Sequence, residues 1–124
     1  MKSNKGFTLI ELLAVIVILA IIALIATPLT LNVINTARAE AAENSAYGVL
    51  DAARLYYAEQ MLASEDVPTG VTVSMLTLSG KAPNNAATAT VTYDNKGNIT
   101  ISDMKFDYGC FKVTSGTLSA GTCQ

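Results

Sequence analysis

The sequence predicts an α+β fold in which one long N-terminal helix packs against a small antiparallel sheet of three or four strands. Two patterns predict this fold. An apolar run passes directly into an amphipathic helical pattern, and the C-terminal half is rich in Thr, Val, Gly and Asn with period-two alternation. At 124 residues the chain suits one domain, with a core small enough that a disulfide or partner subunits usually help.

The helix begins with an apolar segment, residues 7–26 (FTLIELLAVIVILAIIALIA), in which every residue from position 12 onward is apolar. A membrane-spanning helix needs about 20 mostly apolar residues. Lys2 and Lys5 precede the segment, so the positive-inside rule keeps the N-terminus in the cytoplasm and sends the rest of the chain outward. The one charge in the segment, Glu11, would cost about 2.5 to 3.5 kcal/mol at a bilayer centre, which marks it as a functional residue.

Residues 5–13 (KGFTLIELL) resemble the processing motif of type IV prepilins and of the pseudopilins of type II secretion and competence systems. The motif joins a basic leader, a glycine, a phenylalanine, a four-residue step to glutamate and an uninterrupted apolar run. The resemblance is strong over residues 5–34. It implies that a membrane prepilin peptidase cuts between Gly6 and Phe7 and methylates the new amine of Phe7.

The chemistry of these residues suits such processing. Gly6 gives a peptidase access to the backbone without a side-chain clash. Cleavage leaves a cation on Phe7, four residues from Glu11 and on the same helical face. The same pair can form between chains, where a low dielectric strengthens the attraction and fixes the axial register of the subunits. The alternative is an ordinary signal anchor with Glu11 in the membrane interface.

Pro28 interrupts the apolar helix, because proline removes one backbone hydrogen bond and clashes with the preceding turn. We expect either a kink at Pro28 or melting of the helix between Ala20 and Pro28. Ala20 stands where many relatives have glycine, and alanine favours the helix. Beyond Pro28 the helix is expected to continue to residue 62 with an apolar stripe on one face. The stripe comprises Ala46, Val49, Leu50, Ala53, Tyr56, Tyr57 and Met61.

A small head is expected after the helix, which residues 64–70 (SEDVPTG) end. Met75 and Leu76 could form a helical turn or continue a strand. Two alternating segments flank Asp-Asn-Lys-Gly at residues 94–97 and predict a hairpin. The expected strands are residues 71–73, 88–93, 98–102 and 108–114, and their apolar face covers the helix.

Cys110 and Cys123 lie near the C-terminus. In an exported chain such a pair favours a disulfide. Closing this loop would stabilise the fold by about 3 kcal/mol in the chain-entropy model. The alternative, two reduced thiols, would require an exterior poor in oxidants.

The composition argues against an enzyme. The chain has no His, and its net charge of -2 gives no basic surface for nucleic acid. The sequence holds no nucleophile–base pair, phosphate loop or metal-ligand cluster, so we predict no catalytic residue, no cofactor and no metal site. Asp103 and Asp107 could contribute to a cation site, but Lys105 between them favours a solvated turn.

Together these patterns and the resemblance divide the chain into three parts. Residues 1–6 form a leader, residues 7–62 the long helix, and residues 63–124 the β-rich head with its disulfide loop. Within the helix, residues 7–27 would span the membrane and later form the filament core, whereas residues 28–62 would be amphipathic.

The resemblance implies a structural subunit of a type IV pilus. Such a subunit is held in the cytoplasmic membrane by one span, with its N-terminus inside, and is then assembled into a helical extracellular filament. The implied partners are further copies of the chain, the prepilin peptidase, membrane lipid before assembly, a membrane assembly platform and minor pilins.

Three other functions are alternatives to this one. A pseudopilin of a type II secretion or competence system is the closest alternative, since it shares the same chemistry. A filament-borne adhesin or DNA-binding minor subunit ranks lower, because the lysines of the head are scattered among acids. A monomeric anchored protein is the last.

Overall fold

The computed structural model describes residues 5–64, 66 and 69–124. The chain divides into two compact units, with the division between Ala37 and Arg38. One helix, α1 (Leu9–Ala63), contributes to both units. The second unit therefore combines the C-terminal part of α1 with all the strands. This confirms the predicted α+β fold.

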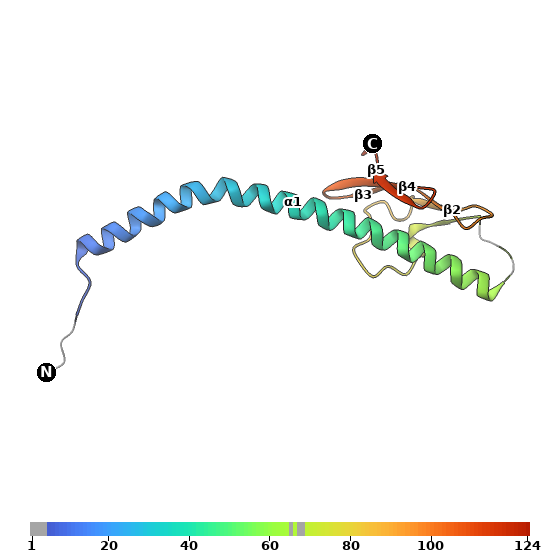
Figure 1. Ribbon diagram of the computed structural model, residues 1–124, viewed down its shortest axis with the longest axis horizontal. Helices are drawn as coiled ribbons and strands as arrows, with labels where there is room; N and C mark the ends of the chain where they lie inside the picture. Colours follow the sequence, from blue (N-terminus) through green and yellow to red (C-terminus); the bar gives the residue numbers. More distant parts are fainter. Residues whose placement is uncertain (1–4, 65, 67–68) are drawn as a thin grey trace. The chain divides into compact units, whose positions relative to one another are not determined.

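The second unit contains a five-stranded antiparallel sheet whose strands follow one another in sequence order. Figure 1 shows the sheet lying along the C-terminal part of α1. The predicted hairpin and the strand after it are confirmed. The strands are β1 (Gly70–Thr72), β2 (Thr90–Tyr93), β3 (Ile99–Phe106), β4 (Gly109–Thr114) and β5 (Thr117–Ala120).

The strand count differs from the predicted three or four because β5 forms within the stretch expected to be a C-terminal loop. Ser115 and Gly116 connect β4 to β5, with φ values of 50° and 80°. Positive φ at both central residues is what a type I′ hairpin turn requires. The turn therefore folds the chain straight back onto β4.

The segment after β1 is a short 3-10 helix, η1 (Val73–Met75), rather than a continued strand. Val73, which was predicted to end the first strand, instead begins η1 and is fully buried. The helical-turn alternative is therefore correct for Met75. Leu76 follows with extended backbone.

A bulge in β3 keeps one face of that strand apolar along its whole length. Ile101 pairs with Val113 and Met104 with Phe111, so β3 has one extra residue between the two pairs. Side chains alternate between faces along a strand. The extra residue resets this alternation, and Ile99 and Ile101 point to the same core as Met104 and Phe106.

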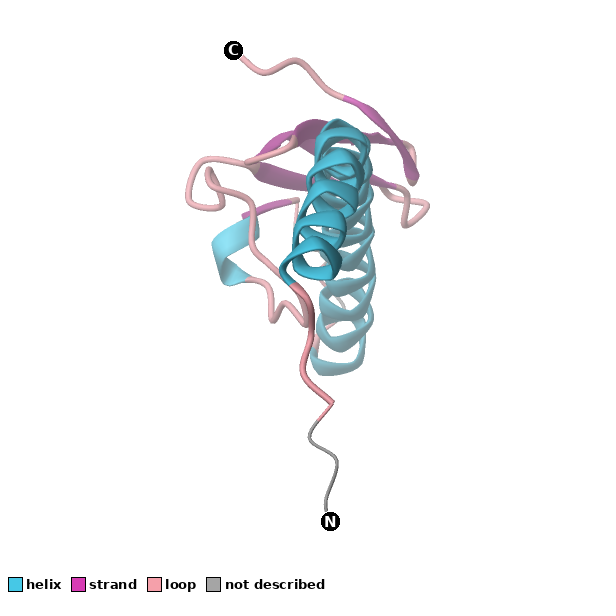
Figure 2. Cartoon of the chain, turned by 90° about the vertical axis from the view of Figure 1, so that its left-hand side faces the viewer, coloured by secondary structure: helices cyan, strands magenta, loops and turns pink. Residues whose placement is uncertain are grey.

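The core lies between this face of the sheet and one stripe of α1. Figure 2, which looks along the helix, shows the strands gathered on one side of it. Three of the buried helix residues are alanines, whose small side chains let the sheet approach the helix backbone closely. The buried stripe is Ala42, Ala46, Val49, Leu50 and Ala53, with Tyr56 and Tyr57 partly buried beside it.

The predicted stripe was right for its central members and wrong at one end. Met61 is 45% exposed, because the core cluster reaches along α1 only as far as Tyr57. At the other end Ala42 is buried although it was not predicted to be. The sheet therefore covers α1 from Ala42 to Tyr57, about one helical turn closer to the N-terminus than the predicted stripe from Ala46 to Met61.

Tyr93 ties β2 to the helix through a buried polar contact. Its hydroxyl donates a hydrogen bond of 3.0 Å to the carbonyl oxygen of Ala53, and its side chain is only 7% exposed. The ring of Tyr57 lies 5.4 Å away, centroid to centroid. Burial raises the pKa of Tyr93 to about 12, and the nearby Tyr56 adds to the rise.

This raised pKa predicts a loss of stability at alkaline pH that Tyr93→Phe removes. Below the ordinary pKa near 10, Tyr93 is neutral in both the folded and the unfolded chain, so its full contribution to the free energy of unfolding is kept. Between about pH 10 and 12 the unfolded chain loses the proton first, so the free energy of unfolding falls by about 2 kcal/mol. Urea unfolding followed by circular dichroism measures this fall.

The matched control for that experiment is Tyr47→Phe, because Tyr47 is exposed and lies outside the core cluster. Between about pH 10 and 12 the free energy of unfolding of this control variant should fall as steeply as that of the unchanged protein. An equally steep loss in Tyr93→Phe would show that burial of this hydroxyl is not the cause.

Candidate functional site

The start of α1 is fixed by a reciprocal pair of hydrogen bonds between Thr8 and Glu11. The amide of Thr8 donates to Oε2 of Glu11 at 2.9 Å, and the amide of Glu11 donates to Oγ1 of Thr8 at 3.3 Å. This is a capping box, in which the residue before the helix and the third helical residue each satisfy an amide of the other. The Glu11 carboxylate also lies at the helix N-terminus, where the helix dipole favours negative charge.

The capping box corrects the predicted beginning of the helix. The sequence predicted helix from Phe7, but α1 begins at Leu9 because Thr8 is the capping residue. Residues 5–8 have no helical structure. Phe7 and Glu11 therefore do not lie on one helical face, although both line a hollow at the start of the helix.

The Gly6–Phe7 bond lies in an open segment. A Cβ added at Gly6 would meet no atom within 4 Å, and Phe7 is 89% exposed. In this uncut chain the Phe7 nitrogen belongs to the peptide bond with Gly6. Its pairing with Glu11 as a free amine therefore remains a prediction.

Thr8 was not predicted to be a site residue. The sequence does contain a pattern that predicts its role, because Thr-Leu-Ile-Glu at residues 8–11 fits the capping-box pattern ahead of an apolar run. Glu11 thus has a contact within its own chain before any contact with another subunit.

The apolar first part of α1 is exposed throughout. Its large apolar side chains range from 89% exposure at Leu9 to 39% at Ile34. Among the described residues, α1 is the one helix that is long and apolar enough to cross a membrane. None of the residues in its most apolar stretch is buried. A surface of this extent needs an apolar environment, such as lipid or further copies of the same segment.

Pro28 lies inside α1, which is helical without a break from Ala20 to Pro28. Melting of this segment is therefore not found in the structure, and a bend at Pro28 stays a prediction. The hydroxyl of Thr27 donates to the carbonyl oxygen of Ala23 at 2.7 Å, and that of Thr30 to Ala26 at 2.8 Å. These bonds turn both hydroxyls inward onto the helix backbone, where they need no external partner.

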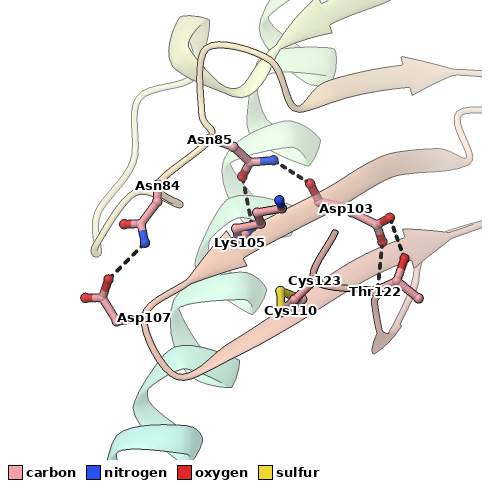
Figure 3. The surroundings of a disulfide bond; sticks show 8 residues. All are labelled: Asn84, Asn85, Asp103, Lys105, Asp107, Cys110, Thr122 and Cys123. Carbon is pink, nitrogen blue, oxygen red and sulfur yellow. Dashed lines mark hydrogen bonds between the residues drawn. A yellow bond between two sulfur atoms is a disulfide. The ribbon is translucent and has the colours of Figure 1, made fainter.

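The C-terminal segment is held to the sheet by a disulfide between Cys110 and Cys123, in agreement with the predicted pairing. Figure 3 shows this bond beside a second attachment, in which Asp103 accepts hydrogen bonds from Thr122. A Cβ on Gly121 would lie 2.6 Å from Oδ1 of Asp103 and 3.0 Å from the backbone carbonyl carbon of Phe111, so a larger residue here would displace the Asp103 side chain and crowd β4. Asp103 lies within the bulge of β3, between Ile101 and Met104.

Asp107, the second carboxylate considered for a cation site, is bound by protein groups instead. It accepts hydrogen bonds from Lys81 and from Asn84, and these contacts hold the pKa of Asp107 below its usual value. Asn84 and Asp107 face each other in Figure 3. Within residues 5–64, 66 and 69–124, no group of three or more His, Cys, Asp or Glu residues is placed to hold a metal ion.

One comparison with known proteins bears on this site. Residues 1–27 match the family model described as the prokaryotic N-terminal methylation motif. This segment includes Gly6, Phe7, the capping box and most of the exposed apolar run. No curated protein and no solved structure matches the chain.

Proposed function

We propose that this chain is a precursor of the type IV pilin and pseudopilin class and, within it, a structural subunit of a type IV pilus, because its first 27 residues match the prokaryotic N-terminal methylation motif. The observation that carries the proposal is the position of the motif, directly ahead of an α1 whose apolar first part is exposed. Such a surface suits a segment that lies first in lipid and then among copies of itself.

In this proposal the precursor crosses the cytoplasmic membrane once, with its N-terminus inside. A prepilin peptidase cuts between Gly6 and Phe7 and methylates the Phe7 amine. The mature chain, served by an assembly platform and minor pilins, then enters an extracellular helical filament. Its role is structural rather than enzymatic, and it needs no cofactor.

Glu11 would set the register of an incoming subunit. A carboxylate in an apolar filament core is costly unless a cation pairs with it. The N-methylated amine of Phe7 on a neighbouring subunit supplies such a cation. To reach it, the Glu11 carboxylate either shares or leaves its hydrogen bond with the Thr8 amide.

The test is intact mass and N-terminal analysis of filaments sheared from cells. We expect a chain that begins at N-methylated Phe7 and is lighter by the two hydrogens lost in the Cys110–Cys123 disulfide. Gly6→Val should stay uncut, because its side chain obstructs the backbone at the cleavage point. Gly80→Val, which adds the same side chain at an open loop glycine, should be cut normally.

Two outcomes would count against the proposal. A chain that still begins at Met1 and occurs only in membranes would leave an anchored protein without a filament. A cut and methylated chain that is absent from sheared filaments would favour the pseudopilin alternative.

A further inference from the structure

A hollow of about 280 Å³ lies in the second unit, between α1 and the turn that joins β3 to β4. Ala41, Ala42 and Phe106 give it an apolar lining. Arg38 and Lys81 also line it and supply cationic groups. The hollow thus combines an apolar surface with positive charge.

Asp107 also lines the hollow, and its carboxylate offsets one of the two cations, so the net positive charge is that of Arg38. Lys81 forms an ion pair with Asp107, whereas neither of the two ion pairs among the described residues involves Arg38. The Arg38 guanidinium instead lies over the Tyr108 ring, with its Cζ atom 5.1 Å from the ring centroid. This cation–π contact holds the guanidinium in place without cancelling its charge.

A second surface on the same unit has the opposite charge. Glu40, Glu43, Tyr47 and Asp51 follow one another along α1 in steps of three and four residues, so they share one face of the helix. This face is separate from the buried stripe, and Tyr47 on it is 46% exposed. Among the described residues the only ion pair on this face joins Asp51 to Arg54, at 3.0 Å.

We propose that Glu40, Glu43 and Tyr47 on the acidic face of one copy dock at the Arg38 hollow of the next copy in the filament. The Tyr47 ring would lie against the apolar lining, and the two carboxylates would face the Arg38 guanidinium. This inference rests on the proposed filament function.

The occupant is a second copy of the chain for two reasons. The two surfaces complement each other in charge, and tyrosine is a residue that interfaces favour because it combines a large apolar ring with a polar tip. The two surfaces also differ from each other and lie on the same unit. A contact between two different patches of identical chains is heterologous, and if it does not close into a ring it extends into an open helical array.

The test is charge exchange in the full-length chain, read as the yield of sheared filaments. Arg38→Glu and the double variant Glu40→Lys/Glu43→Lys each oppose like charges across the contact, so each should lower the yield about tenfold or more. The variant that combines all three substitutions exchanges the charges and should restore the yield. Lys112→Glu changes charge at an exposed position of β4 outside both surfaces and should leave the yield unchanged.

The outcomes separate this interface from the function on which it rests. Normal yield from Arg38→Glu, or a combined variant that stays low, would overturn the interface while filaments of the unchanged chain uphold the function. If the unchanged chain yields no filaments, the proposed function fails and the interface fails with it.

Discussion

Glu11→Gln is expected to abolish filament formation while leaving the head folded and the chain inserted in the membrane. The substitution removes the charge but keeps a side chain that can complete the capping box, since Gln serves this position as well as Glu does. Breaking a buried ion pair by removing one partner costs about 3 to 5 kcal/mol. That cost recurs at every subunit contact in a filament, so we expect no filaments to be recovered.

Thr8→Ala separates the charge of Glu11 from its role in the capping box. This variant keeps the carboxylate and loses the hydroxyl that accepts the Glu11 amide hydrogen bond, at a cost of about 1 kcal/mol to the helix start. Filaments should still form. The measurement is the yield of sheared filaments, compared with the amount of mature chain in membranes.

The opposite pattern would contradict the register role. Normal filaments from Glu11→Gln together with few from Thr8→Ala would mean that Glu11 acts only as a helix cap. A neutral side chain should enter the bilayer more easily than a carboxylate, so the amount of membrane-inserted Glu11→Gln chain should not fall. A fall would contradict the expectation that this variant is impaired in assembly alone.

Leu50→Ala should produce the largest loss of stability among single changes in the helix stripe. Leu50 is 2% exposed and is the largest fully buried side chain of the helix stripe. Truncating a buried leucine to alanine removes apolar contacts and leaves a cavity, which costs about 2 to 5 kcal/mol. Denaturant unfolding of the full chain in detergent, followed by circular dichroism, would measure it.

Leu55→Ala is the matched control, because it makes the same truncation on the same helix at a side chain that is 57% exposed. Its cost should be within about 0.5 kcal/mol. Similar losses in both variants would show that the helix stripe assigned here is not what holds the sheet to α1.

The helix and the β2–β3 hairpin could be predicted from the sequence because their signals are local. The apolar run, the steps of three and four, and the alternation on either side of residues 94–97 all lie within single elements. Strand β5 was missed although its turn is also local. Ser115 and Gly116 fit a two-residue hairpin turn, but they were assigned to an open loop closed by the disulfide.

The remaining features depend on contacts between segments distant in the sequence. The bulge in β3 is defined only by its pairing with β4, and Asp103 within it accepts a hydrogen bond from Thr122, which lies 19 residues away in the sequence. Asn85 shows the same dependence, because its side-chain amide bonds the backbone of Asp103 and of Lys105 across the sheet edge. No periodicity within one element specifies such contacts.

The position of the capping box has a consequence for the timing of maturation. Thr8 and Glu11 both lie on the C-terminal side of the proposed cut between Gly6 and Phe7, and the helix begins two residues beyond that cut. A peptidase could therefore receive an extended substrate without unwinding any of α1. Removal of the leader would change the charge at the N-terminus but would leave the first turn of the helix already formed, so processing and helix folding become independent steps.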